Sequence, residues 1–225
     1  MFIRTLLLLV CFSFFGSVAA QEDELGNWLM YFGTNRLSDK FSIHSEVQYR
    51  NHTVAPVNIE QLLLRTGLNY HFAPNASVTF GYAYVPSYIY ESEQSAPETT
   101  EHRIFQQLIL TNNVGKVKFE HRYRVEQRWV NGDYRNRLRY RLMAFFPLNK
   151  PSIETGTLFL GLYDEIFLNT EKVFLDLNCL YGCLSYHRKN TTSAQLGLLH
   201  QRVNDFGKYY LQFALFFNPD FRRQD

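Results

Sequence analysis

Beyond its first twenty residues, the 225-residue chain contains no long apolar run, and its mean hydropathy is −0.26. A membrane-spanning helix needs about 20 consecutive apolar residues, so we exclude a helical membrane protein. Charge of one sign is also scarce, since 23 Lys and Arg face 21 Asp and Glu, for a net charge of +2. Proteins that bind nucleic acid normally carry a basic surplus, and we expect no nucleic-acid partner. A transmembrane β-barrel agrees with both absences, because its strands alternate apolar and polar residues.

Cysteine is scarce as well, and only Cys179 and Cys183 lie beyond residue 20. They fall in a segment with strand-like alternation, where four residues of extended chain place the two Cα atoms about 13 Å apart. A disulfide requires a Cα separation below about 7 Å. We therefore predict two free thiols on one face of a strand. No His or third Cys completes a metal-binding spacing, so we expect no metal and no other cofactor.

The first twenty residues have the pattern of an export signal. A positively charged start at 1–4 is followed by an almost wholly apolar stretch at 5–15 and by small residues at 16–20. This pattern is typical of a cleaved signal peptide and too short for a spanning helix. We therefore predict a signal peptide at 1–20 and a single exported domain at 21–225.

Aromatic residues are abundant, at 16% of the chain, and almost every segment alternates with a period of two. Such alternation predicts strands. The candidate strands are 25–34, 40–50, 60–72, 76–89, 101–114, 116–129, 135–147, 156–169, 174–187, 192–203 and 207–217. Each is ten or more residues long, whereas strands of soluble proteins usually have about five or six. A tilted strand needs about 9–11 residues to cross a bilayer, so these lengths favour a membrane barrel.

The connections between these segments alternate in character. Short polar turns are expected at 35–40, 73–76, 112–116 and 187–191, and longer connections at 52–58, 90–100 and 170–173. Short turns at one end and longer loops at the other are typical of outer-membrane barrels, which places the acidic loop 90–100 outside the cell. Single-chain bacterial barrels have an even number of strands. We therefore predict a single antiparallel transmembrane β-barrel of ten or twelve strands, although eleven segments are recognised.

The two faces of these segments differ in kind. Along 116–129, charged residues occupy every second position, and Val, Phe, Tyr and Trp occupy most of the others. Along 78–90, the even face is bulky and aromatic, while the odd face consists of small residues. A secreted sandwich or a lipocalin-like fold is the alternative. A bulky outer face opposite a face of small and charged residues favours lipid outside and a crowded lumen inside.

Several motifs resemble a known family. They are Trp28, LLRTGLNY at 63–70, GYAY at 81–84, EHRIFQQ at 101–107, HRYRVEQR at 121–128, NRLRYR at 136–141 and YDEIF at 163–167. With these motifs the chain resembles a Gram-negative outer-membrane β-barrel family catalogued as a domain of unknown function. The resemblance covers most of the chain and implies a barrel in the bacterial outer membrane. It implies no established activity.

The inner face between residues 101 and 165 is rich in arginine. The candidate residues for a lumen charge network or an anion-binding site are Arg103, Arg122, Arg124, Arg128, Arg137, Arg139, Arg141, Glu101, Glu126 and Glu165. Lys116, Lys118, Arg135 and Glu120 are assigned to the same face. The positive residues outnumber the negative ones along this arc, and Glu46, Glu60 and Asp176 on the opposite wall could neutralise the surplus.

Three interpretations of this inner face remain open. In the first, it is mainly structural, because arginine forks bind carboxylates bidentately and small barrels are often filled. Glu101, Glu126 and Glu165 would then pair with Arg103, Arg124, Arg137 or their neighbours. In the second, the arginines line a narrow anion-selective pore or anion-binding transporter.

The third interpretation is a barrel hydrolase that acts on lipid or polysaccharide, for which His44 beside Ser42 and Glu46 is the nearest candidate. No catalytic constellation is evident along the sequence, which favours a protein that is not an enzyme. The expected partners are outer-membrane lipid, the barrel-assembly machinery during insertion, and small anions. The oligomeric state stays open.

Overall fold

The computed structural model describes residues 25–90, 96–170, 175–203 and 206–222. The predicted signal peptide at 1–20 and residues 91–95 of the predicted outer loop lie outside the described residues, as does the side chain of Asp176. No helix long and apolar enough to span a membrane occurs in the described part of the chain.

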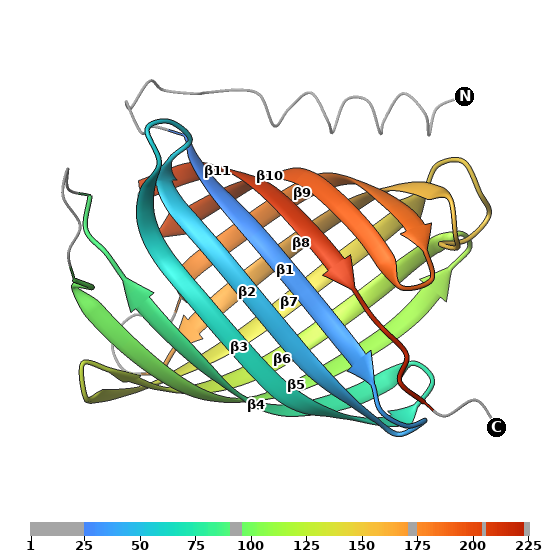
Figure 1. The fold of residues 1–225 in the computed structure, drawn as a ribbon, viewed down its shortest axis with the longest axis horizontal. Coiled ribbons are helices and arrows are strands. Elements are labelled where there is room, and N and C mark those ends of the chain that lie inside the picture. The colour runs from blue at the N-terminus through green and yellow to red at the C-terminus, as the bar shows by residue number, and fades with distance from the viewer. Residues whose placement is uncertain (1–24, 91–95, 171–174, 204–205, 223–225) are drawn as a thin grey trace.

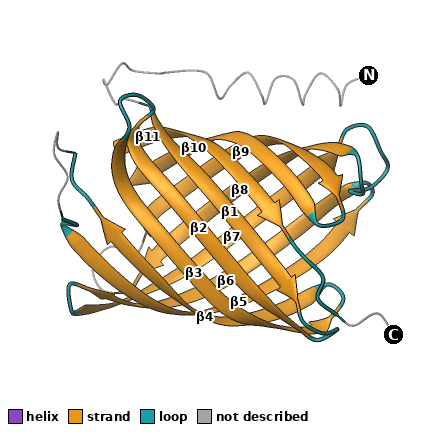
Figure 2. Cartoon of the chain, viewed as in Figure 1, coloured by secondary structure: helices purple, strands orange, loops and turns teal. Residues whose placement is uncertain are grey.

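The described residues form a closed all-β barrel (Figures 1 and 2). Its strands are β1 (Gly26–Arg36), β2 (Phe41–Thr53), β3 (Asn58–Ala73), β4 (Ala76–Ser87), β5 (Thr99–Val114), β6 (Val117–Val130), β7 (Asp133–Pro147), β8 (Thr157–Asn169), β9 (Leu175–Lys189), β10 (Thr192–Val203) and β11 (Phe206–Phe217). The period-two alternation thus marked each strand, because side chains of an extended chain point alternately to opposite faces.

The prediction of ten or twelve strands is wrong, since the barrel closes with eleven. Consecutive strands pair antiparallel, but β1 pairs with β11 in parallel, from Gly26 opposite Tyr210 to Gly33 opposite Phe217. An even number is required only when the first and last strands also pair antiparallel. Parallel closure removes that requirement.

Because the number of strands is odd, β1 begins at one mouth of the barrel and β11 ends at the opposite mouth. We call the end where β1 begins the loop mouth; there the Val54 N–H donates to the Leu25 carbonyl. The opposite end, where β11 finishes, is the turn mouth; there the Arg36 N–H donates to the Pro219 carbonyl. Figure 1 shows β1 starting and β11 ending at opposite ends. The four predicted short turns all lie at the turn mouth, together with a longer connection at 148–156.

Burial alternates along the strands as the pattern of faces predicted. On β6, Arg124 and Glu126 are buried, whereas their neighbours Tyr123 and Val125 are 46% and 38% exposed on the outer face. The outer face is rich in exposed Leu, Val, Phe and Tyr throughout the barrel. The prediction of free thiols is confirmed, because Cys179 and Cys183 form no disulfide and are buried on one face of β9.

The lumen is filled by two kinds of side chain. An apolar cluster consists of Trp28, Phe167, Cys179, Tyr181, Cys183, Leu199 and Tyr210. These residues come from β1 and from β8 to β11, and we call the cluster the apolar half. The charged side chains of β2 to β8 form the other part, which we call the ionic half.

Candidate functional site

The ionic half is organised around Glu126, which is 1% exposed. Arg139 donates from Nη1 to Glu126 Oε1 at 2.9 Å and from Nε to Glu165 Oε1 at 2.9 Å. Arg122 donates to the same Glu165 oxygen at 2.6 Å. Two arginines therefore meet at Glu165, and Arg139 links this carboxylate on β8 to Glu126 on β6.

Arg65 extends this network to the far side of the barrel. Its Nη1 donates to both oxygens of Glu46 on β2, at 2.7 and 2.8 Å, and its Nη2 lies 4.0 Å from Glu126 Oε1. Arg65 stands on β3, three strands away from Glu126 on β6. The connection therefore crosses the lumen instead of following the wall.

Phe105 occupies the space between two guanidiniums of this network. Its ring centroid lies 5.4 Å from Arg65 Cζ and 5.1 Å from Arg124 Cζ, distances at which cations attract aromatic faces. Glycine makes room for the ring, because a Cβ at Gly81 would lie only about 2.5 Å from it. Arg124 in turn donates to Gln107 Oε1 from Nε, at 3.0 Å, and from Nη2.

Two smaller ion-pair groups accompany the central network. Glu101 accepts two bonds from Arg103, at 2.7 and 2.8 Å, and two from Arg128, of which the Nη2 bond measures 2.9 Å. Glu120 accepts from Arg141 at 2.5 Å. Charge-assisted, bidentate pairs of this kind are the stronger class of hydrogen bond in proteins.

The predicted site residues mostly gather in this half of the lumen, but their partners differ in detail. Glu101 binds Arg103, as expected, whereas the closest partner of Glu126 is Arg139, with Arg124 at 3.6 Å. Arg137 lies over the ring of Phe167 at 5.7 Å, and Glu165 binds Arg122 and Arg139 in its place.

Two residues assigned to the inner wall lie outside it. Lys116 is exposed in the turn between β5 and β6, because β5 ends at Val114 and β6 begins at Val117. Arg135 is exposed near the start of β7 at the loop mouth. Arg135 lies opposite the inward-facing Arg128 and is nevertheless exposed, because alternation gives the face of a residue and not its distance from the end of the barrel.

Sequence analysis missed the contribution of Arg65. Its position on the inner face of β3 follows from alternation, and Glu46 lies directly opposite in the β2–β3 register. The predicted network includes arginines of 101–165 only and leaves Glu46 on the opposite wall without Arg65 as its partner. Glu60 faces Tyr210, whose hydroxyl donates to it at 3.0 Å.

A serine and a histidine do meet in the lumen, although not the pair expected. Ser42 Oγ lies 2.8 Å from Nε2 of His71, while Asn69 donates to Ser42 and Thr79 donates to Asn69. His44 binds Glu46 at 3.0 Å. Ser42 is 0% exposed, and a nucleophile has to meet its substrate. We therefore assign these side chains a structural role near the turn mouth.

The ionic half has more cations than anions. Among the described residues, seven arginines form ion pairs with five glutamates of the lumen. Arg65 Nε, Arg122 Nε, Arg124 Nη1 and Arg141 Nε are buried and find no hydrogen-bond partner among the described atoms. The surplus makes the centre of the lumen electropositive.

A family model described as Protein of unknown function (DUF2490) matches residues 25–212. No curated protein and no solved structure matches the chain. The matched region begins just before β1 and reaches into β11, so it contains the whole ionic half. By this match over most of its length, the chain belongs to the DUF2490 family.

Proposed function

We propose that this protein is an outer-membrane β-barrel with a closed lumen whose arginine network is structural. The outer face supports a membrane position, because strands of 11 to 16 residues present exposed Leu, Val, Phe and Tyr around the barrel. Lipid of the outer membrane would cover this face, and the barrel-assembly machinery would insert the exported chain.

The closed lumen is supported mainly by a series of ion pairs that bridges it. Glu46, Arg65, Glu126, Arg139 and Glu165 form a continuous chain of ion pairs from β2 to β8. Phe105 fills the space beside Arg65, and the apolar half fills the region along β9 to β11. Breaking such buried pairs is costly, so the bridge opposes any spontaneous opening.

Single-channel recording tests this proposal directly. The purified barrel would be added to a planar bilayer under a KCl gradient. Heat-dependent electrophoretic mobility would verify that it is folded, and protease protection in vesicles of the same lipid would verify that it inserts. We expect no steady conductance from the inserted protein. Steady channels in the wild-type protein would refute the closed lumen.

The surplus of guanidiniums favours a narrow anion-selective pore or anion-binding barrel as the second candidate. Buried guanidinium nitrogens without a partner could bind chloride, phosphate or a carboxylate. The same recording separates the two functions, since a reversal potential that favours chloride would support the pore.

Replacing Arg122, Arg124 and Arg139 together by Ala sharpens the result. In a closed barrel the triple variant loses stability, because Glu165 loses both of its partners and Glu126 keeps only Arg65, at 4.0 Å. In an open pore it loses chloride selectivity. A triple variant that is as stable as wild type and conducts in the same way would contradict both functions.

A further inference from the structure

The outer face of β4 to β7 carries three polar pairs. Tyr82 on β4 bonds His102 on β5 at 2.5 Å, and His121 on β6 bonds Tyr140 on β7 at 2.9 Å. Between them, Gln106 and Gln127 bond each other reciprocally, with both N···O distances at 3.2 Å. All six side chains point away from the lumen, because they share the outward alternation of the exposed and half-exposed positions on their strands.

At mid-height the β4–β7 face differs from the wall of β9 to β11. Polar side chains also occur elsewhere on the outer face, since Asn178 on β9 donates to Asp164 on β8 at 2.6 Å and His200 stacks on Tyr209. The outward positions midway along β4, β5, β6 and β7 are Tyr82, Gln106, Tyr123 and Tyr140. On the opposite wall, the corresponding positions of β9, β10 and β11 are Gly182, Leu198 and Leu211. Figure 1 places these two walls on opposite sides of the barrel. What sets the β4–β7 wall apart is its reciprocal amide pair between two hydroxyl–imidazole pairs.

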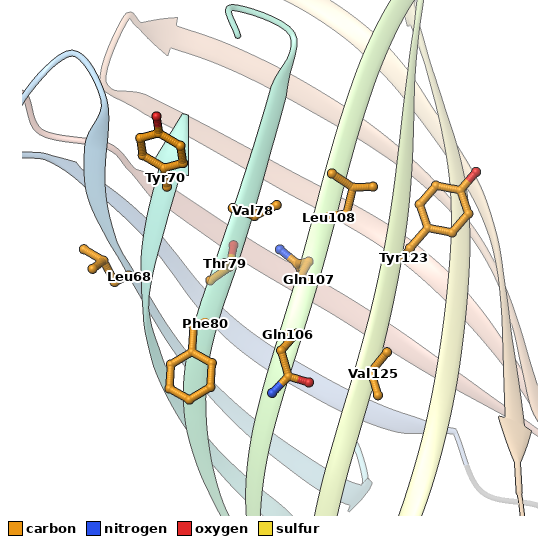
Figure 3. A pocket seen from close by; sticks show the side chains of 10 residues that line it. All are labelled: Leu68, Tyr70, Val78, Thr79, Phe80, Gln106, Gln107, Leu108, Tyr123 and Val125. Carbon is orange, nitrogen blue, oxygen red and sulfur yellow. The ribbon is translucent and has the colours of Figure 1, made fainter. Parts of the chain in front are cut away.

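A hollow lies on the same wall, over β3 to β6. It has a volume of about 520 Å³ and is lined mainly by outward apolar side chains, among them Leu68, Val78, Phe80, Leu108 and Val125. Gln106 contributes a polar edge to it (Figure 3), and Phe80 is its Cα partner in the β4–β5 register. Apolar side chains of another molecule could enter this hollow while polar groups meet at Gln106.

The glutamine pair leaves hydrogen-bonding capacity unused. Each amide offers two N–H donors and an acceptor oxygen, and the reciprocal pair occupies one donor and one acceptor of each side chain. If the barrel spans a membrane as proposed above, the remaining groups face hydrocarbon, where unsatisfied polar groups are costly. Acyl chains cannot satisfy them, whereas a second amide can.

We infer that the β4–β7 face binds a second copy of this chain in the membrane, with Gln106 close to the two-fold axis. The amide is both donor and acceptor and is therefore self-complementary, which is what a symmetric dimer requires. The six polar side chains of this face are Tyr, Gln and His, so they offer no carboxylate or guanidinium to attract a charged partner. This inference rests on the proposed membrane position.

Disulfide crosslinking tests it. Gln106→Cys and Leu198→Cys would each be reconstituted as full-length protein in phosphatidylcholine vesicles and oxidised, with wild type as the control for Cys179 and Cys183. We expect at least tenfold more crosslinked dimer from Gln106→Cys than from Leu198→Cys, because Leu198 lies on the opposite wall. Equal crosslinking at both positions, or none at position 106, would overturn the dimer.

A second measurement asks whether the amides themselves hold the dimer. Subunit mixing by fluorescence transfer in the same vesicles would compare wild type, Gln106→Leu/Gln127→Leu and the control Leu198→Ala. We expect the double variant to weaken association at least tenfold and the control to leave it unchanged. A double variant that associates as wild type does would overturn the role of the glutamine pair.

The two proposals fail in different ways. Protease protection and heat-dependent mobility report insertion independently of association. An inserted but monomeric protein, with lipid in the hollow, refutes the dimer alone. A wild-type protein that does not insert refutes the membrane position, and the dimer falls with it.

Discussion

The two halves of the lumen solve the same packing problem with different chemistry. The ionic half joins strands that are not neighbours, since Arg65 on β3 reaches Glu126 on β6. The apolar half packs neighbouring strands by shape, with small residues such as Cys183 beside the larger Tyr181 and Leu199. Ion pairs are directional, and removing one partner of a buried pair is costly. Apolar packing is non-directional, and its free energy is roughly proportional to the buried apolar area. The halves should therefore respond differently to substitution.

The largest effect is expected where one carboxylate serves several cations. Glu126→Gln leaves Arg139 without one of its charge partners and removes the anion that faces Arg65 and Arg124. Losing one partner of a buried pair costs about 3–5 kcal/mol, and urea unfolding in detergent micelles would measure the loss. The control is Glu154→Gln, because its pair with Lys150 is solvent-exposed and should contribute at most about 1 kcal/mol. Equal losses would contradict a special role for Glu126.

The apolar half should lose stability through a cavity. Leu199 is 0% exposed, and truncation to Ala is expected to cost about 2–5 kcal/mol. Its neighbour Leu198 is 47% exposed on the outer face, so Leu198→Ala provides the matched control. Both would be followed by the same urea titration. If the outer-face variant lost as much stability as Leu199→Ala, the cluster would not be a packed core.

A smaller loss of stability is expected on substitution of Gly81, which packs against the ring of Phe105. An added Cβ at Gly81 would collide with the Phe105 ring and with the backbone carbonyl of Thr66, and overpacking of this kind costs about 1–3 kcal/mol. Phe105→Leu in the same chain should recover part of the loss, so a double-mutant cycle measures the coupling. Additive losses would show that the collision is relieved elsewhere.

The smallest effect concerns the segment after β11, at the turn mouth. Arg222 bonds Asp220, at 2.9 Å from Nε, and Asp39, at 2.6 Å, and it lowers the pKa of Asp220 from 3.8 to about 2. A lowered pKa means that the interaction stabilises the folded protein above the ordinary pKa and is lost as the pH falls towards 2. Arg222→Ala should return the pKa of Asp220 towards 3.8, as measured by NMR titration of the carboxyl carbon. An unchanged pKa would exclude Arg222 as its cause.

Much of the fold was predictable from local pattern. All eleven strands were recognised within a few residues of their ends, because alternation persists along an extended chain. The predicted count of ten or twelve is wrong because it follows the even strand number of single-chain bacterial barrels, whereas this barrel closes in parallel. Nothing in the alternation of β1 or β11 indicates that the two strands pair in parallel.

The sequence predicted which residues belong to the candidate site, but not which of them pair with one another. Alternation assigned Arg122, Arg124 and Arg139 to the inner face, where they are buried or half-buried. It did not predict that Glu165 would bind Arg122 and Arg139 and not Arg137, because the choice depends on side-chain reach across a curved wall. It also did not reveal the bridge from Arg65 to Glu126, which depends on the width of the lumen.

The sequence by itself determined which side chains face the lumen and which face outward, because that choice follows from the two-residue period of an extended backbone. Tertiary structure alone decided the parallel seam between β1 and β11, the placement of the start of β1 and the end of β11 at opposite mouths, and the partners of each charge. Those features depend on how strands distant in the chain are staggered and curved around a closed barrel. The stagger brings Arg65 within 4.0 Å of Glu126.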